Sequence, residues 1–132
     1  VQLSLVRGLD PELHIRIGEA LSALRDSNIL VIGSGFSFHN MRAFSFRGET
    51  AADPMNIRFE DWLMQTCTAD SLSEAERRQR LVNWEAAPHA RYCHPREEHL
   101  LPLHVCYGSA GTASRRVFSG KILGRQASAF LW

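Results

Sequence analysis

The sequence predicts an α/β fold, with a central, mostly parallel or mixed β-sheet flanked by helices, from three observations near its beginning. Residues 1–6 alternate apolar and polar side chains, as a half-buried strand does. Residues 11–25 repeat apolar side chains at helical spacing, after an aspartate suited to the N-cap and a proline suited to the first turn. Residues 28–33 are a short apolar run, typical of a strand covered on both faces. Strand, helix and strand in this order form a βαβ unit, which is most simply parallel and right-handed.

The middle of the chain predicts two further helices. Asp53 and Pro54 indicate a helix that continues to about Ala69. Ser73 with Glu76 three residues later is a capping box, which predicts a helix reaching about residue 84. The apolar side of the first of these helices is expected to carry Ile57, Trp62, Leu63 and Met64.

The C-terminal third predicts one helix and two strands. Pro95 is a good first-turn residue, so we expect a helix from there to about Gly108, with a kink at Pro102, which lacks the N–H that a helix interior needs. Residues 117–122 and 127–131 have the composition of short strands. We therefore expect one domain over residues 1–132.

Composition excludes several function classes. The 132 residues carry a net charge of +1, so there is no basic surplus to attract nucleic acid. No apolar run approaches the ~20 residues of a membrane helix. Three cysteines, an odd number, argue against a disulfide scaffold and for a reducing, cytoplasmic location. The first residue is Val1, within a predicted strand, so we expect the chain to be part of something longer.

A glycine turn follows the predicted strand at residues 28–33. Gly33 and Gly35 allow the backbone to turn sharply where open α/β sheets place their ligands, and His39 and Asn40 lie just beyond. The third glycine of a dinucleotide-binding loop is missing. His39 can be a loop histidine that donates to a backbone carbonyl, or a functional imidazole acting as base, acid or metal ligand.

Three other histidines are spaced by five residues. His94, His99 and His104 would each point about 140° away from the next on a helix, so they cannot form one metal-binding stripe. His104 has apolar neighbours and fits a buried face, while His94 fits a helix cap. His99, beside Glu98, is the best placed to share a pocket with His39.

The remaining candidates have simpler interpretations. Glu97 and Glu98 fit first-turn acids that complement the helix dipole, although Glu98 can also belong to the site. The cysteines, which lack Cys-x-x-Cys spacing, read as structural thiols, and the arginines near residue 78 read as a solvated helix face. The cysteines are Cys67, Cys93 and Cys106, and the two histidines without a predicted role are His14 and His89.

Two segments together resemble the class III extradiol ring-cleavage dioxygenases, in the branch of the 4,5-DOPA dioxygenases. One is Ile-Gly-Ser-Gly-Phe-Ser-Phe-His-Asn, ending at Asn40, and the other is His-Pro-Arg-Glu-Glu-His-Leu-Leu-Pro-Leu, beginning at His94. The similarity covers nearly the whole chain but only the C-terminal part of such a protein. It therefore implies that residues 1–132 are the C-terminal half of a longer dioxygenase domain.

The resemblance also implies a chemistry. It implies a non-haem metal, Fe²⁺ in the first place with Zn²⁺ as a possible occupant, and a catechol-type aromatic diol and O₂ as substrates. His99 matches a metal-ligand position, and His39 matches an active-site histidine that is an acid/base or a ligand. Glu98 and His94 lie in the same motif without an assigned role. If His39 removes a catechol proton, it must be neutral, so activity is expected to fall as the pH drops through its pKa.

The resemblance leaves two functional alternatives. A facial triad needs three protein ligands, and the chain has only two positions that match the family. The first alternative is a dioxygenase whose site is completed by an N-terminal half or a partner subunit. The second is a non-catalytic subunit that binds metal or another protein and lacks the N-terminal ligands.

Overall fold

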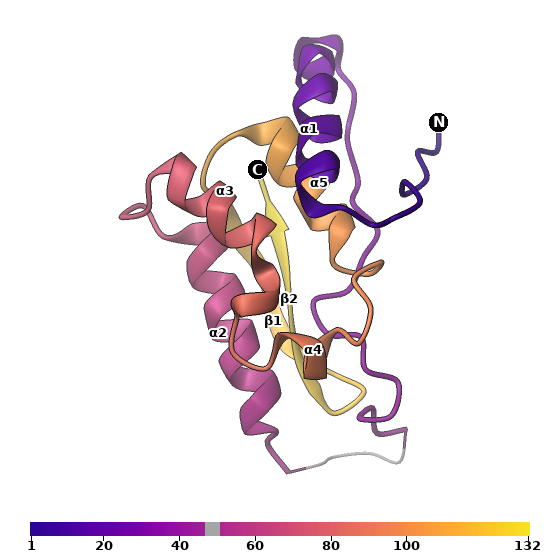
Figure 1. Ribbon diagram of the computed structural model, residues 1–132, viewed down its shortest axis with the longest axis vertical. Helices are drawn as coiled ribbons and strands as arrows, with labels where there is room; N and C mark the ends of the chain where they lie inside the picture. Colours follow the sequence, from indigo (N-terminus) through magenta and orange to yellow (C-terminus); the bar gives the residue numbers. More distant parts are fainter. Residues whose placement is uncertain (47–50) are drawn as a thin grey trace.

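The computed structural model describes residues 1–46 and 51–132, which form helices packed beside a two-stranded sheet (Figure 1). In chain order the elements are α1 (Pro11–Leu21), η1 (Ser22–Ser27), α2 (Pro54–Thr68), α3 (Glu74–Val82), η2 (Trp84–Ala86), α4 (Ala90–Cys93), α5 (Leu101–Ala110), β1 (Arg115–Ile122) and β2 (Arg125–Leu131).

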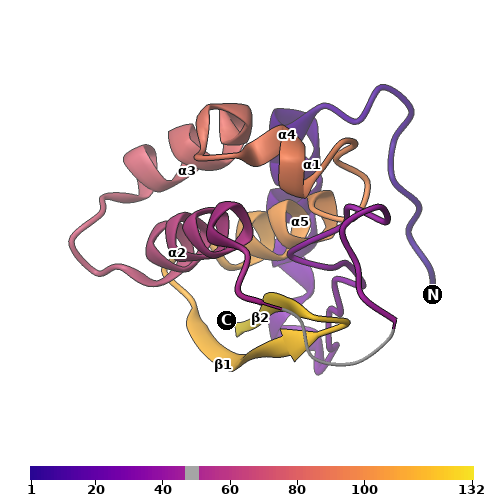
Figure 2. The same cartoon turned by 90° about the horizontal axis from the view of Figure 1, so that it is seen from below.

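The sheet is an antiparallel hairpin of β1 and β2, which confirms both predicted C-terminal strands. The pairing runs from Arg115 opposite Leu131 to Ile122 opposite Arg125. Figure 2 shows α2 and α5 beside this hairpin, and α3 and α4 beyond α2. The α/β class is therefore confirmed, and the chain is a mixture of helices with a small antiparallel sheet.

The two strands predicted at residues 1–6 and 28–33 are wrong. Neither segment pairs as a strand, and β1 and β2 form the one sheet within residues 1–46 and 51–132. A strand is defined by hydrogen bonds to a neighbouring strand, and neither stretch joins the sheet of β1 and β2. The local pattern at residues 28–33 is that of a buried strand, yet Leu30 and Ile32 are each 77% exposed.

Helix starts follow the predicted caps. The Asp53 carboxylate accepts hydrogen bonds from the backbone N–H groups of Met55 and Asn56, at 3.0 and 3.2 Å. Ser73 and Glu76 form the expected capping box. The first predicted helix ends earlier than expected, at Leu21, and continues as the 3₁₀ turn η1. Arg25 of this turn donates to the carbonyls of Ser109 and Ala110 at the end of α5.

The helix predicted from Pro95 begins instead at Leu101. Pro102 therefore lies in the first turn of α5, where a missing N–H breaks no helical hydrogen bond, and the predicted kink does not occur. Residues 95–100 form turns that end where the N–H groups of Leu100 and Leu101 donate to the carbonyl of Glu97. The irregular segment before α5 brings His99 close to the glycine turn.

A core of buried side chains joins the helices to each other. It consists of Ile15, Phe38, Phe59, Leu63, Cys67, Leu81, Trp84, Ala87, Ala90, Cys93, Leu100 and Tyr107. The predicted apolar side of α2 is confirmed at Leu63, which is buried, and at Trp62, which packs against the core, but it is wrong at Ile57, which is exposed. Phe59 and Cys67 also face the core. Cys67, Cys93 and Cys106 are free thiols, and burial raises the pKa of Cys67 to about 12.

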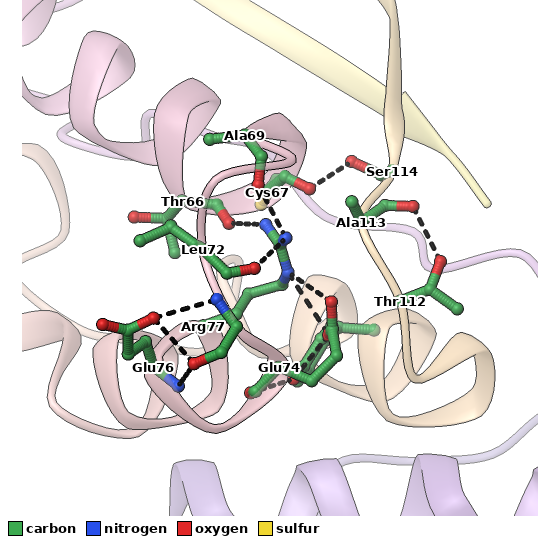
Figure 3. A network of polar contacts seen from close by, with 12 residues as sticks. Thr66, Cys67, Ala69, Leu72, Glu74, Glu76, Arg77, Thr112, Ala113 and Ser114 are labelled. Carbon is green, nitrogen blue, oxygen red and sulfur yellow. Dashed lines mark hydrogen bonds and ion pairs between the residues drawn. The ribbon is translucent and has the colours of Figure 1, made fainter.

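Arg77 links the end of α2 to the start of α3 (Figure 3). Its guanidinium donates to the carbonyl of Thr66 and, at 2.9 Å, to that of Ala69, and it pairs with Glu74 at 3.2 Å. The side chain is only 1% exposed, so the predicted solvated arginine face is wrong at this position. Arg78 pairs with Glu12 and Glu19 of α1 and so joins α3 to α1.

None of the helices in the described ranges has both the length and the apolar character needed to cross a membrane.

Candidate functional site

The structure stacks the imidazole rings of His39 and His99 on each other. Their centroids are 3.5 Å apart and their planes are inclined by 24°. Both side chains are half-buried, and each lies in an irregular segment, one after the glycine turn and one before α5. The two histidines for which the sequence predicts a shared pocket therefore lie side by side.

Three hydrogen bonds hold these two segments together. The backbone N–H of Phe36 donates to the carbonyl of His99 at 2.9 Å, and the backbone N–H of His39 donates to the carbonyl of Cys93 at 2.9 Å. Between them, the His94 Nε2–H donates to the carbonyl of Ser37 at 2.8 Å. Residues 36–39 are thus attached to residues 93–99 along their length.

Gly35 is required by this close approach. A Cβ atom at position 35 would collide with the carbonyl oxygen of His99 and would contact the ring of Pro102 at 3.3 Å. The turn therefore lets the backbone pass close to the segment that carries His99. Asn40, directly after His39, donates from its amide to the carbonyl of Tyr92 at 2.8 Å and secures the other end of the segment.

The surroundings of His39 favour its neutral form. Its pKa is lowered mainly by partial burial and then by His99, while the nearby Glu98 opposes the shift. Besides His99, its ring lies near the ring of Phe44, with centroids 6.4 Å apart. The hydrogen bond from His39 to the Cys93 carbonyl comes from the backbone N–H. The loop-histidine alternative has the imidazole as the donor to a backbone carbonyl, so this bond is not the one which that alternative expects.

Glu97 and Glu98 lie before α5 and not in its first turn. The prediction that they complement the helix dipole from inside the helix is therefore wrong. Glu97 pairs with Arg91 at 2.7 Å, and Glu98 pairs with Arg96 at 3.3 Å. Glu98 remains close enough to His39 to raise its pKa, so it belongs to the surroundings of the histidine pair.

His94 is fully buried behind the histidine pair. Its ring packs on Phe59 and Trp84, with centroid separations of 5.3 and 6.0 Å. Burial lowers its pKa to about 4, so the imidazole is neutral, with its proton on Nε2 facing the Ser37 carbonyl. Its Nδ1 is buried and has no hydrogen-bond partner among the described residues.

The other histidines have structural positions. His104 is buried, as its apolar neighbours predict, and its Nε2–H donates to the Leu81 carbonyl at 2.8 Å. His14 is buried in α1, donates from Nδ1 to the Asp10 carbonyl at 2.6 Å and accepts from the backbone N–H of Val6. His89 is exposed at the start of α4. Of the three histidines spaced by five residues, His99 is the one stacked on His39.

Imidazole nitrogens are suitable ligands for iron and zinc, so the donor type at this site fits a non-haem metal. The arrangement limits the number of ligands, because a metal ion lies close to the plane of each imidazole that binds it. Two stacked, nearly parallel rings do not share such a point, so the pair as arranged offers one ligand to an ion. Within residues 1–46 and 51–132, no three His, Cys, Asp or Glu side chains group as a metal site.

Sequence reasoning missed two polar residues behind the pair, Ser37 and Glu60. Glu60 is buried at 3% exposure on α2, where its carboxyl group faces Ser37. One signal was available, since Glu60 is spaced by three and seven residues from Leu63 and Cys67 and so lies on the buried stripe. The motif after the glycine turn singled out His39 as a candidate site residue, but nothing in it singled out Ser37.

Comparison with known proteins places this chain in one family. The sequence model for the catalytic LigB subunit of aromatic ring-opening dioxygenase matches residues 1–130. A protein of Hapsidospora irregularis named dioxygenase tasH is 34% identical over 100% of this chain and 43% of its own length. A 4,5-DOPA dioxygenase extradiol of Beta vulgaris is 35% identical over 86% of this chain and 40% of its own length.

A solved structure has the same fold over most of the chain. It is that of an uncharacterized protein of Escherichia coli K12, with a TM-score of 0.75 and 26% identity, and the match covers 89% of this chain and 48% of that one. This chain therefore spans less than half the length of the proteins it matches. On the match over residues 1–130, it belongs to the family of the catalytic LigB subunit of aromatic ring-opening dioxygenases.

Proposed function

We propose that this chain supplies part of the active site of a metal-dependent extradiol dioxygenase, which inserts O₂ into a catechol-type aromatic ring. The observation that carries the proposal is the stacking of His39 on His99 at 3.5 Å, by two segments that match the family's motifs. We further propose that residues 1–132 form the C-terminal half of one domain.

The proposal assigns different roles to His39 and His99. Since stacked rings offer an ion one ligand, His99 would hold the metal, Fe²⁺ or alternatively Zn²⁺, and His39 would exchange protons. His39 is a metal ligand only if its ring turns away from His99. When bound, the metal would supply a positive charge that favours the deprotonated catechol and a place where catechol and O₂ meet.

The surroundings of His39 suit proton transfer. A neutral imidazole has one ring nitrogen free to accept a proton, and the pKa of His39 is lowered by burial and by His99. His39 would accept a proton from a catechol hydroxyl at that nitrogen and return it later in the reaction. Glu98 opposes the lowering of the pKa and so would stabilise the imidazolium that forms between these two steps.

The remaining ligands would come from a part of the protein that this chain does not contain. The relatives are more than twice as long as the part that matches. A groove of about 770 Å³ runs between the extended segment at residues 29–33 and the hairpin, and His99 lies on its wall. An N-terminal half, or a partner subunit, seated in this groove would reach the histidine pair. Free thiols in such a protein suit the reducing cytoplasm.

Ring cleavage by the longer protein tests the proposal. With Fe²⁺ and a catechol, the protein should consume O₂ and form a yellow ring-opened product. His39→Ala and His99→Ala should each abolish turnover, and His99→Ala should also lower the metal content. An unchanged metal content in the His99 variant would refute its role as a ligand, and His89→Asn, an exposed histidine, is the matched control.

A non-catalytic subunit is the second candidate function. The observation that favours it is that no three potential ligands group within the described ranges. This candidate predicts no O₂ consumption even when the complete protein and any partner subunit are present. Such a result would sink the dioxygenase proposal for this chain.

A further inference from the structure

A buried polar cluster lies directly behind the histidine pair, and Ser37 is at its centre. The Ser37 Oγ accepts a hydrogen bond from the backbone N–H of Ser128 in β2 at 3.0 Å. The carbonyl of Ser37 accepts the His94 Nε2–H at 2.8 Å. From α2, the carboxyl group of Glu60 faces the hydroxyls of Ser37 and Ser128. These four residues, Ser37, Glu60, His94 and Ser128, are the Ser37 cluster.

The Ser37 cluster buries polar atoms that have no hydrogen-bond partner among the described residues. Both carboxyl oxygens of Glu60 and the Nδ1 of His94 are shielded from solvent, and within the described ranges none of the three has a hydrogen-bond partner. The hydroxyls of Ser37 and Ser128 are close enough to lower the pKa of Glu60 but make no hydrogen bond to it, and burial raises that pKa to about 7. Burying unsatisfied polar groups opposes folding, so hydrophobic packing alone does not explain these residues.

The position of the segment that carries His39 depends on hydrogen bonds from residues distant in sequence. Residues 36–40 contain no helix or strand, so regular hydrogen bonding does not fix their backbone. The Ser37 cluster holds that backbone two residues before His39, and the Cys93 carbonyl holds it at His39 itself. Since Cys93 and His94 are consecutive, the His94 side chain and the Cys93 carbonyl together hold the backbone from which the His39 side chain extends.

We infer that His94, acting through the Ser37 carbonyl, is a positioning residue that keeps His39 stacked on His99. The inference rests on the proposed function for its catalytic consequence, but its geometric part stands without it. His94 does not contact substrate in this account. Its role is to hold the segment that carries the proton-transferring histidine.

Nuclear magnetic resonance of the 132-residue chain tests the geometric part. The wild type should show a nuclear Overhauser effect between the ring protons of His39 and His99, and the ¹⁵N shifts of His94 should be those of the Nε2–H tautomer. His94→Phe keeps the ring volume and removes the donor, and it should reduce the effect between His39 and His99 by at least about half. His94→Gln, which still offers an N–H near the Nε2 position, should retain it.

Two further variants keep the inference falsifiable. His89→Asn alters an exposed histidine and should leave the effect unchanged. If His94→Phe does not fold, as judged by circular dichroism, His94→Leu also removes the donor to the Ser37 carbonyl and should also weaken the effect. Full stacking of His39 on His99 in a folded His94→Phe protein, or in a folded His94→Leu protein when His94→Phe is unfolded, would overturn the inference.

Kinetics of the longer protein tests the catalytic consequence. A displaced acid/base group lowers kcat rather than binding, so His94→Phe should lower kcat about 100-fold with KM changed less than about threefold. His94→Gln should recover most of the loss. An unchanged kcat in His94→Phe would overturn the catalytic part. A wild type with no ring cleavage instead counts against the proposed function, and the resonance experiment still decides whether His94 positions His39.

Discussion

At the scale of single residues, burial determines the protonation of the groups behind the histidine pair. Burial is the largest cause of the lowered pKa values of His94 and His104, and it raises the pKa of Cys93 to about 12. These groups are therefore uncharged near neutral pH. Glu60 differs, because its pKa of about 7 places its ionisation within the physiological range.

Glu60 should make the stability of the protein depend on pH. Its pKa is raised from 4.5 to about 7 in the folded state, so the folded protein retains a proton that the unfolded chain releases between these values. The contribution of protonated Glu60 to the free energy of unfolding is then fully present below pH 4.5. It falls as the pH rises to about 7, by about 3 kcal/mol in total. Glu60→Gln does not titrate and should lack this loss, which urea unfolding at several pH values measures.

The charges near Glu60 are few and supply the control for this experiment. Asp61 raises its pKa and Arg116 lowers it, and the thiols of Cys67 and Cys93 also lie within electrostatic range. Asp61→Asn removes the neighbouring exposed carboxylate and should keep most of the pH dependence of the wild type, because burial is the largest cause of the raised pKa of Glu60. Equal pH dependence in Glu60→Gln and wild type would contradict the assignment to Glu60.

The sequence identified the two histidines of the pair, but it did not identify the residues that lie behind them. His39 and His99 stand in motifs whose residue types point to chemistry, and the structure brings the two together, although their roles stay predictions. Ser37 gave no signal, because a serine after a glycine turn is typical of loops in general. Its importance arises from a carbonyl and a hydroxyl that meet His94 and Ser128, distant in sequence.

At the scale of elements, local capping chemistry predicted the helix starts, and long-range contacts decided the rest. The Asp53 cap reaches Asn56, three residues later, and the Ser73 capping box reaches Glu76, also three residues later, so a short stretch of sequence contains each interaction in full. The start of α5 depends on Pro102, and its preference for the first turn outweighed the alternative start at Pro95. The buried face of α2 depends on what packs against it, which periodicity alone did not provide.

Arg77 should be essential for the junction of α2 and α3. Its guanidinium satisfies the carbonyls of Thr66 and Ala69 near the end of α2, and the side chain is 1% exposed. Arg77→Met keeps much of the volume but leaves these carbonyls unpaired, so it should lower the free energy of unfolding by about 3 kcal/mol. Urea denaturation followed by circular dichroism measures the change.

Arg80 on the same helix provides the comparison for Arg77. It is only partly buried, and its charge acts on the exposed Glu76. Arg80→Met should therefore change stability by less than about 0.5 kcal/mol. Similar losses in both variants would mean that charge on α3, rather than the buried hydrogen bonds of Arg77, stabilises the junction.

At the scale of the whole molecule, residues 28–33 have the apolar sequence of a buried strand but exposed side chains, and this indicates an uncovered apolar surface. The run is as apolar as a strand covered on both faces, yet Ile29 is 51% exposed and Leu30 and Ile32 are each 77% exposed. On the opposite wall of the groove, Phe118 and Ile122 of β1 are also exposed. The prediction of a buried strand failed because, within residues 1–46 and 51–132, no strand pairs with this run.

Substitution at Leu30 can show whether the groove is covered in the longer protein. In the 132-residue chain, Leu30→Asp should cost less than about 0.5 kcal/mol, because the side chain is already exposed. In a protein of the relatives' full length, the same change would bury a carboxylate among apolar groups and should cost about 3 kcal/mol or more. Leu30→Val keeps the side chain apolar and should cost less than about 1.5 kcal/mol in both. Equal, small costs of Leu30→Asp in the two proteins would mean that the groove stays open, and the further ligands that the proposed function requires would then have to reach His99 from another side.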